Sequence, residues 1–227
     1  MSKPLVIAVD GPSGAGKSSV CRAVATELGL EYLDTGSMYR AVTWFVQSKG
    51  VDPLNVAEIA QLVNSAEVLP STNPAEPGIK VGDVNVSEPI RSEAVTQAVS
   101  AVSAVPQVRT LMVALQREIV ARSHSGIVVE GRDICAVVLP DAPIKIFITA
   151  DPKARAARRA KEVGANMSDT NLSMEKRDHA DSTRAMSPLE IAKLIDLLPV
   201  FLYMVFGLIC LSARESPIII KSKGPLL

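Results

Sequence analysis

The sequence predicts an α/β protein in which helices cover both faces of a doubly wound parallel sheet. Short apolar runs of branched residues recur along the chain, and longer segments with apolar residues every three or four positions separate them. Continuous apolar runs are typical of parallel strands buried on both faces, whereas the longer period is typical of amphipathic helices. Their alternation favours a parallel sheet with crossover helices.

The first strand is expected at residues 5–9, "LVIAV", and a glycine-rich loop follows it directly. Residues 11–18 have the spacing G-x-x-x-x-G-K-[ST] of a phosphate-binding loop, or P-loop. Apolar residues recur at four-residue intervals from Val20 to Leu28, and Gly29 suits a helix C-terminus, so a helix begins within the motif. The strand, loop and helix order predicts a nucleoside triphosphate site at the helix N-terminus.

The next elements follow the same alternation. Residues 31–34 are expected to form a strand that ends at Asp34-Thr35-Gly36 and leads into a helix. Between about residues 66 and 88 the composition changes to Pro, Gly, Asn and Asp. Ile79/Val81 and Val84/Val86 alternate there around Gly82-Asp83. This spacing predicts a small antiparallel hairpin.

The second half begins with a long helix, expected between Pro106 and Gly126. Two buried strands follow, at residues 126–133 and 144–150, and residues 151–184 are charged and helix-prone. Arg132 and Asp133 come directly after an apolar run, so they are expected at the carboxyl end of a strand, where α/β proteins bind ligands.

A P-loop alone does not choose between GTPases, motors and small-molecule kinases. The sequence contains neither the N-K-x-D guanine motif nor the D-x-x-G switch of a GTPase. Arginines that could bind a phosphorylated acceptor are instead spread through the second half: Arg109, Arg132, Arg155, Arg158, Arg159, Arg177 and Arg184. Exposed helical faces also carry arginines, so Arg122, Arg155 and Arg159 are equally open to that interpretation.

The overall composition limits the partners and the compartment. Lys+Arg and Asp+Glu both total 24, so no global field attracts nucleic acid or an anionic membrane. Cys21, Cys135 and Cys210 are widely spaced, which favours reduced thiols in a cytoplasmic protein, and the N-terminus leads straight into the first strand without a secretory signal. His124 and His179 have no nucleophile partner and are expected at the surface.

Five segments resemble the bacterial cytidylate kinases. They are "GPSGAGKSS" (11–19), "LDTGSMYRA" (33–41), "VSAVSAVPQVR" (99–109), "VVEGRDICAVVLPDAPIKIFITA" (128–150) and "KRDHADSTRAMSPL" (176–189). The resemblance covers roughly residues 3 to 189 in family order. It implies a P-loop kinase fold with a parallel-sheet core, a monophosphate-binding domain with a small antiparallel β insert, and a lid. It also implies that ATP, with Mg²⁺, phosphorylates CMP or dCMP.

The resemblance implies a division of one monomeric kinase unit. Residues 3–34, 99–150 and 185–189 would form the core, residues 35–98 the monophosphate-binding region, and residues 151–184 the lid. Residues 190–227 depart from the family pattern and form an atypical apolar tail.

The resemblance also implies the roles of individual residues. The P-loop would hold the ATP phosphates through Gly11, Pro12, Ser13, Gly14, Ala15, Gly16, Lys17, Ser18 and Ser19, with Ser18 as the Mg²⁺ ligand. The acceptor nucleotide would contact Thr35, Arg40, Ser100, Arg109, Arg132, Asp133, Arg177, Asp181 and Arg184. The catalytic cations would be Lys17, Arg132, Arg158 and Arg184. Two alternatives stay open: Ser100 could cap a helix, and Asp181 could form a surface ion pair.

The base-reading roles follow the chemistry of cytosine. Asp133 would accept a hydrogen bond from N4, while Arg109 would donate to N3 and O2. Uracil reverses the donor and acceptor at positions 3 and 4, which would leave both side chains mispaired. A P-loop kinase for another small acceptor would lack this set.

The tail supports a competing interpretation. Leu197 to Leu211 carries no charge, yet a membrane helix needs about 20 apolar residues, so a buried or misfolded segment is favoured over a span, and an altered reading frame near Leu189 stays open. The alternative function is therefore a catalytically weak or membrane-associated nucleotide-binding protein. "PIIIK" (217–221) could replace the final strand that the family pattern leads one to expect.

Overall fold

A five-stranded sheet forms the centre of the protein, which we describe from a computed structural model covering residues 4–151, 153, 155 and 218–220. The strand order is β2-β6-β1-β7-β8. The strands are β1 (Val6–Asp10), β2 (Glu31–Asp34), β6 (Ile127–Gly131), β7 (Ile144–Ala150) and β8 (Ile218–Ile220). The predicted strand at residues 144–150 is confirmed without a change of boundary.

The parallel pairing places three strand ends together. β1 pairs in parallel with both β6 and β7, and β2 pairs in parallel with β6. The register aligns Asp10 with Gly131 and Asp34 with Glu130. The carboxyl ends of β1, β2 and β6 therefore meet at one edge of the sheet, which is where the predicted ligand residues begin.

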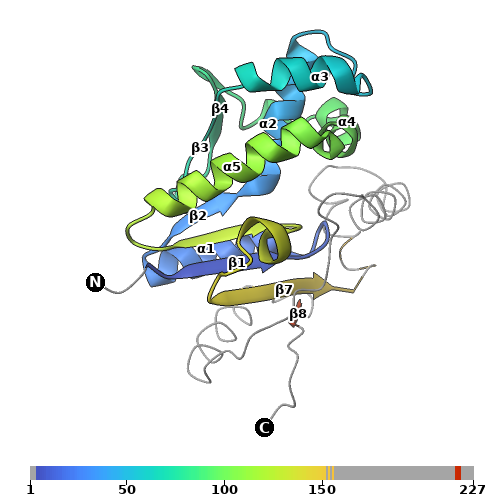
Figure 1. Cartoon of the computed structure of the whole chain (residues 1–227). Helices are drawn as coiled ribbons and strands as arrows, with labels where there is room; N and C mark the ends of the chain where they lie inside the picture. Colours follow the sequence, from blue (N-terminus) through green and yellow to red (C-terminus); the bar gives the residue numbers. More distant parts are fainter. Residues whose placement is uncertain (1–3, 152, 154, 156–217, 221–227) are drawn as a thin grey trace.

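Helices cover both faces of this sheet, as expected of a doubly wound fold (Figure 1). α1 (Lys17–Leu28) lies on one face, whereas α2 (Thr35–Ser48) and α5 (Pro106–Arg122) lie on the other. Because side chains alternate along a strand, Ile7 and Val9 of β1 pack in the cluster with α1, while Ala8 packs in the cluster with α2 and α5. These two clusters fix the sheet between its helices.

A smaller layer extends from the α2 side of the sheet. It contains α3 (Val56–Leu62), α4 (Glu93–Ala104) and a three-stranded sheet in the order β3-β4-β5. β4 (Ile79–Val81) and β5 (Val84–Asn85) confirm the predicted hairpin. β3 (Val68–Pro70) was not anticipated, because three residues ending in proline carry little strand signal.

Polar side chains begin the helices that border this layer. Asp34 caps α2 by accepting from the backbone N–H of Ser37, and Ser92 caps α4 by accepting from that of Val95. Such caps satisfy backbone donors that a helix leaves unpaired. The cap at Asp34 makes the turn from β2 into α2 sharp, so Thr35 begins the helix directly at the sheet edge.

The strand at the β7 edge comes from the tail. β8 pairs with β7 in antiparallel orientation, with Ile218 opposite Ala150 and Ile220 opposite Ile148. The proposal that "PIIIK" supplies a final strand is therefore confirmed. The sheet differs from an all-parallel one by this single edge strand, which is a common arrangement in α/β proteins.

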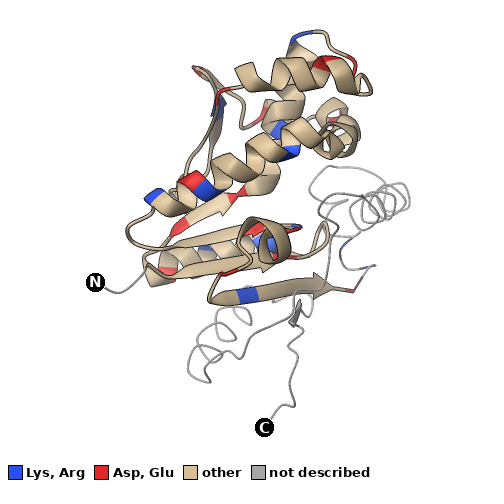
Figure 2. Ribbon diagram, viewed as in Figure 1, with Lys and Arg blue, Asp and Glu red and all other residues tan. Residues whose placement is uncertain are grey.

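Two further expectations concern charge and membranes. Basic and acidic residues are interspersed over both layers of the described ribbon (Figure 2), in keeping with the balanced composition. Within the described residues no single helix has the length and apolar character needed to cross a bilayer. α4 and α5 have that length and character only when they are taken together, and the angle between them is 93°. The stretch Leu197 to Leu211 lies outside the described residues.

Candidate active site

The P-loop connects the end of β1 to the start of α1. Gly14 and Gly16 have φ values of 68° and 84°, a left-handed conformation that glycine adopts without steric cost. These two residues turn the loop back on itself before α1 begins at Lys17. The N-terminal N–H groups of α1, which have no partner within the helix, therefore face the loop and favour an anion there.

A cavity of about 380 Å³ opens in front of the loop and reaches into the smaller layer. It contains most of the predicted ligand residues: Ser13, Gly14, Ala15, Gly16, Lys17, Ser18, Ser19, Thr35, Arg40, Ser100, Arg109, Arg132 and Asp133. Gly11 and Pro12 do not line it, but their carbonyls hold Lys17. The fold thus gathers residues from five separate segments around one space.

Three basic side chains lie on the backbone of the loop. Lys17 Nζ donates to the carbonyls of Gly11 (2.9 Å) and Pro12 (3.0 Å), and Arg132 Nη1 also donates to Gly11 (2.8 Å). Arg155 Nη1 donates to the carbonyl of Ser13 (3.0 Å). Burial and, secondly, the charge of Arg132 lower the pKa of Lys17 to about 8. Positive charges held this close together favour the binding of a polyanion at the loop.

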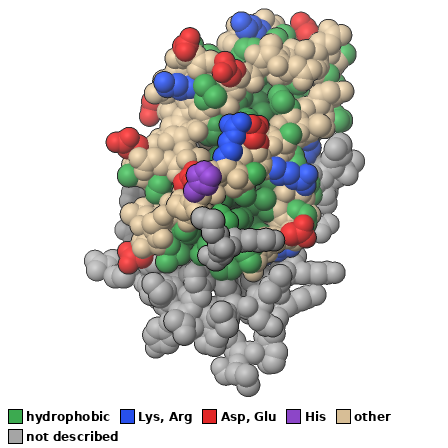
Figure 3. Space-filling model, turned by 60° about the vertical axis from the view of Figure 1, so that its left-hand side comes forward, with side chains coloured by type: hydrophobic (Ala, Val, Ile, Leu, Met, Phe, Trp, Pro, Cys, Tyr) green, Lys and Arg blue, Asp and Glu red, His purple; other side chains and the backbone are tan. Residues whose placement is uncertain are grey.

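The sequence left open whether Arg155 and Arg122 lie at the phosphate site or on an exposed helical face, and the structure gives a different answer for each. Arg155 contacts the P-loop, which brings it to the site rather than to a solvated helical face. The Arg122 side chain is 78% exposed and pairs with Glu118 one turn earlier on α5. His124 is exposed, as expected. Figure 3 shows a histidine side chain in purple on the surface of the described part of the chain.

Glu130 of β6 lines the same cavity and was missed by the sequence analysis. It is 3% exposed, accepts a hydrogen bond from the Tyr32 hydroxyl, and also hydrogen-bonds with Ser18. Burial and, next, the neighbouring charge of Asp34 raise the pKa of Glu130 to about 7, although Lys17 opposes this shift. A carboxylate within the apolar run "IVVEG" was the available signal, because buried acidic residues are rare unless they are paired.

The oxygen atoms around Ser18 suit a magnesium ion. The Ser18 hydroxyl and the Glu130 and Asp34 carboxylates are hard oxygen donors on the cavity wall. Among the described residues no group of three or more His, Cys, Asp or Glu could hold a metal without other ligands. Mg²⁺ requires no such cage, since it usually retains water and takes substrate phosphates as ligands. The residues present therefore fit the predicted role of Ser18.

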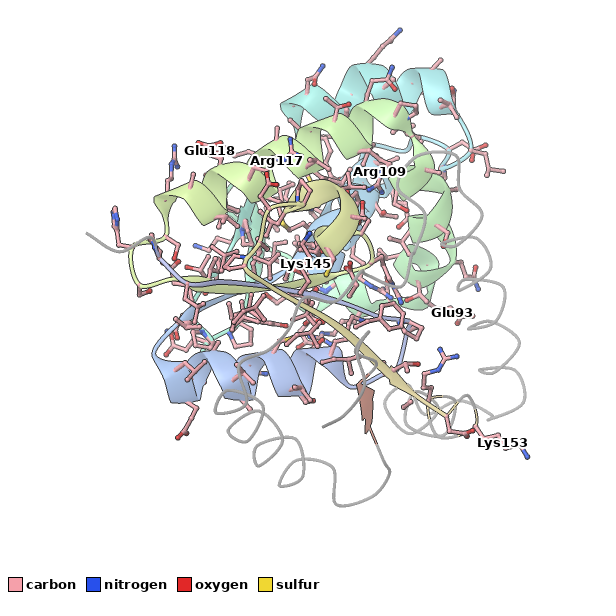
Figure 4. The ribbon with its side chains drawn as sticks, turned by 60° about the horizontal axis from the view of Figure 1, so that its bottom comes forward. Glu93, Arg109, Arg117, Glu118, Lys145 and Lys153 are labelled. Carbon is pink, nitrogen blue, oxygen red and sulfur yellow. The ribbon has the colours of Figure 1, made fainter. Side chains whose placement is uncertain are left out.

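Arg109 and Asp133, which both line the cavity, form a buried ion pair. Their side chains are 2% and 5% exposed, and Arg109 Nη2 donates to Asp133 Oδ2. The Arg109 guanidinium also lies over the Tyr39 ring, 5.4 Å from its centroid. Arg109 extends from α5 toward the interior (Figure 4), and its Nε has no partner among the described residues. A buried donor without a partner is costly unless a ligand satisfies it.

The turn that carries Arg132 and Asp133 is held from two sides. The Asp10 carboxylate accepts from the first two backbone N–H groups of the helical turn η3 (Ile134–Val138), at 2.9 Å each. Arg117 of α5 donates to the carbonyls of Val137 (2.8 Å) and Val138 (2.9 Å). Burial raises the pKa of Asp10, a residue that the sequence analysis also missed. These contacts fix Arg132 and Asp133 relative to the P-loop.

The remaining described candidates, Thr35, Arg40 and Ser100, also line the cavity. Thr35 Oγ1 donates to the Glu130 carbonyl (2.8 Å), and Arg40 Nη1 donates to the Ile90 carbonyl (3.0 Å) and Thr96 Oγ1 (2.9 Å). Ser100 lies inside α4, whose N-cap is Ser92, so the alternative that Ser100 caps a helix is wrong. Five predicted residues fall outside the described part of the chain: Arg158, Arg159, Arg177, Asp181 and Arg184.

The parallel sheet, the P-loop and the arginine-lined cavity together define a P-loop kinase. The sequence model of the family described as "Cytidylate kinase" matches residues 7–198. The chain is 56% identical over 186 residues to a cytidylate kinase of Streptomyces griseus subsp. griseus, covering 82% of this chain and 80% of that relative. It is 49% identical over 194 residues to the cytidylate kinase of Mycobacterium leprae, covering 83% and 85%.

These matches span most of the chain. The chain therefore belongs to the cytidylate kinase family, and phosphorylation of CMP is the function that this membership gives it. Among solved structures, a gluconokinase of Sinorhizobium meliloti 1021 is similar with a TM-score of 0.44 and 15% identity, covering 95% of this chain and 97% of that structure.

Proposed function

We propose that this kinase transfers the γ-phosphoryl group of ATP to CMP or dCMP, giving ADP and CDP or dCDP, with Mg²⁺ bound to the nucleotide. The observation that supports this best is the buried Arg109–Asp133 pair in the same cavity as the P-loop. The P-loop in that cavity suits a polyphosphate, and the Arg109–Asp133 pair presents a donor and an acceptor that are shielded from water. Two nucleotides bound there would meet with their phosphates between Lys17 and Arg132.

The donor nucleotide would be held by the P-loop. Residues Gly11 to Ser19 would surround its phosphates with backbone N–H groups, and Lys17 would leave the Gly11 and Pro12 carbonyls to contact the β- and γ-phosphates. Ser18 would coordinate the Mg²⁺, with Glu130 and Asp34 nearby to bind its water ligands. When bound, Mg²⁺ neutralises charge on the β- and γ-phosphate oxygens.

The acceptor base would be recognised by Arg109, Asp133 and Ser100. Asp133 would accept from the cytosine N4 amino group, and Arg109 would donate to N3 and O2. Because the Arg109 guanidinium and the Asp133 carboxylate carry opposite charges and form an ion pair, the pair has no net charge before the base binds. With uracil, two buried groups would be mispaired, at about 1–3 kcal/mol each.

The acceptor phosphate would be held by Arg40 and Arg132, with Thr35 at the start of α2 beside them. We assign Arg158, Arg177, Asp181 and Arg184 to the same task on the family resemblance: Arg158 and Arg184 to the transferring phosphoryl group, and Arg177 and Asp181 to the phosphate and sugar.

The reaction needs no general base. The acceptor phosphate has a second pKa of about 6, so at neutral pH the attacking oxygen is largely ionised. Lys17 and Arg132 would stabilise the charge that spreads over the equatorial oxygens during transfer, and alignment of the two phosphates would supply the remaining rate enhancement. Exclusion of water from the cavity while both nucleotides are bound would prevent hydrolysis of ATP, in which water accepts the phosphoryl group.

The proposal also covers the compartment, the oligomeric state and the kind of partner. The zero net charge supports binding of small molecules rather than of nucleic acid or an anionic membrane. On the family resemblance we also assign the protein to the cytoplasm as a monomer. The alternative of a weakly active, membrane-associated protein depends on Leu197 to Leu211, which lies outside the described residues, and no other observation favours it.

A coupled assay of ADP release tests the proposal directly. Purified full-length protein is given ATP and Mg²⁺ with CMP, dCMP, UMP, AMP or GMP, and Lys17→Ala serves as the inactive control. We expect CMP and dCMP to stimulate ADP release far more than the other three acceptors. ADP release that no monophosphate stimulates would contradict the kinase assignment, and stimulation by UMP equal to that by CMP would contradict the assigned base recognition.

A further inference from the structure

Tyr32 carries a buried hydroxyl that the proposed reaction does not use. It lies on β2, is 2% exposed, and donates its hydrogen bond to Glu130 Oε1 on the neighbouring strand β6. Burial and the adjacent Glu130 charge raise the pKa of the Tyr32 hydroxyl, so it remains protonated and able to donate. Tyr32 also borders the cavity that contains the P-loop.

The acceptor of this hydrogen bond is held from two sides. The Glu130 carboxylate hydrogen-bonds with Tyr32 on β2 and with Ser18 on α1. Asp34, its register partner on β2, is a like charge that opposes ionisation of Glu130 in its present position. A carboxylate beside a like charge would turn away unless hydrogen bonds held it. Tyr32 and Ser18 are the two side-chain donors that do so among the described residues.

We propose that Tyr32 is a positioning residue for the Mg²⁺–nucleotide site: its hydroxyl holds the Glu130 carboxylate against Ser18. This inference rests on the proposed function, in which Ser18 coordinates the ion. Without the hydroxyl, Glu130 is free to rotate toward solvent. The oxygen surface that receives the ion's water ligands is then no longer fixed before the nucleotide binds. Such outer partners typically tune metal affinity by about tenfold or more.

The Tyr32 ring has a separate, structural role. It packs with Ile7 and Val128 in the cluster that α1 covers. Phenylalanine has the same ring, so Tyr32→Phe keeps this packing and removes only the contact with Glu130. The substitution therefore separates positioning of Glu130 from stability of the core.

The test compares ATP affinity with and without Mg²⁺. Isothermal titration calorimetry gives the ATP dissociation constant of the full chain in Mg²⁺ and in EDTA, and their ratio measures the gain due to the ion. We expect Tyr32→Phe to reduce this ratio about tenfold and to leave the affinity in EDTA unchanged. Ser123→Ala is the matched control, because it removes another buried hydroxyl at the far end of α5.

A second variant shows whether Tyr32 acts through Glu130. Glu130→Gln should reduce the same ratio, and adding Tyr32→Phe to it should cause little further loss, since the two residues act as one unit. Additive losses would overturn the inference. So would an unchanged ratio in Tyr32→Phe, an equal loss in Mg²⁺ and EDTA, or failure of Tyr32→Phe to fold. A wild-type protein that gains no ATP affinity from Mg²⁺ would instead contradict the proposed function.

Discussion

Asp133 is a buried partner of Arg109 and is also the carboxylate that we propose selects the acceptor base. It neutralises the charge of the Arg109 guanidinium at a position where both side chains are buried. Breaking a buried ion pair by removing one partner typically costs about 3–5 kcal/mol, because the other charge stays buried alone. The same carboxylate is the group that we expect to distinguish the N4 amino group of cytosine from the O4 carbonyl of uracil.

We therefore predict two effects of Asp133→Ala. The free energy of unfolding should fall by about 3–5 kcal/mol, as measured by urea denaturation. The ratio of kcat/KM for CMP to that for UMP should fall at least about tenfold, with a smaller change in the KM for ATP. Equal losses with CMP and UMP would reject the selectivity role, and unchanged stability would reject the structural one.

Glu130 gives a pH dependence whose sign can be worked out. Its pKa is about 7 in the folded protein against an ordinary value of 4.5, so between these values the folded state holds more proton than the unfolded state. Stability from this group is complete below pH 4.5 and is lost as pH rises through 7. Glutamine at this position does not titrate.

We predict that the free energy of unfolding of the wild type, relative to that of Glu130→Gln, falls as pH rises from about 4.5 to 7. Urea denaturation of both proteins in EDTA, at several pH values, measures the difference while avoiding binding of metal. A difference that is constant over this range, or that increases with pH, would show that the folded state does not raise the pKa of Glu130.

Elements with a strong local pattern were predictable, whereas contacts between elements were not. The continuous apolar run at 144–150 and the P-loop spacing each define their structure within a few residues. β3 gave almost no local signal because it is held by its pairing with β4. The Tyr32–Glu130 contact depends on strands that are distant in sequence, so no spacing rule could reveal it.

The residues of the site divide in the same way. Lys17, Ser18 and Thr35 occur in motifs, and the cavity contains each of them. The role of Asp10 in holding η3 appears only once β1 and the turn after β6 are adjacent. Sequence could name Arg109 and Asp133 separately through the family resemblance, but the buried pairing between them is a result of the fold.

The edge strand β8 provides a prediction at the scale of an element. Its pairing protects the edge of β7, the strand that leads from the sheet to Arg155. Proline at Ile219 would fix φ at about −65° and remove the N–H of the central residue of this three-residue strand, and both changes disfavour an extended strand paired with β7. Ile219→Val keeps a branched residue that suits a strand and serves as the control.

We predict that Ile219→Pro lowers Tm by several degrees, which corresponds to a loss of about 1–2 kcal/mol for a chain of this length. Ile219→Val should stay close to the wild type. Differential scanning fluorimetry of the three proteins measures the effect. If the proline variant melted at the wild-type temperature, β8 would contribute nothing to the stability of the sheet.

At the scale of the whole molecule, residues from both layers line one cavity, in which we propose that two nucleotides are recognised. The sheet edge and α1 provide the P-loop, whereas α2, α4 and α5 provide Arg40, Ser100 and Arg109. The turn after β6 carries Arg132 and Asp133 between these two sides. We propose that this single cavity holds donor and acceptor together, with their phosphates in contact.

A bisubstrate compound tests this claim most directly. Adenosine and cytidine joined through their 5′ positions by five phosphates would fill both halves of the cavity at once. We predict that it binds one molecule per chain in calorimetry and inhibits competitively against both ATP and CMP. Competition with ATP alone, together with noncompetitive inhibition against CMP, would place the acceptor elsewhere and contradict the account.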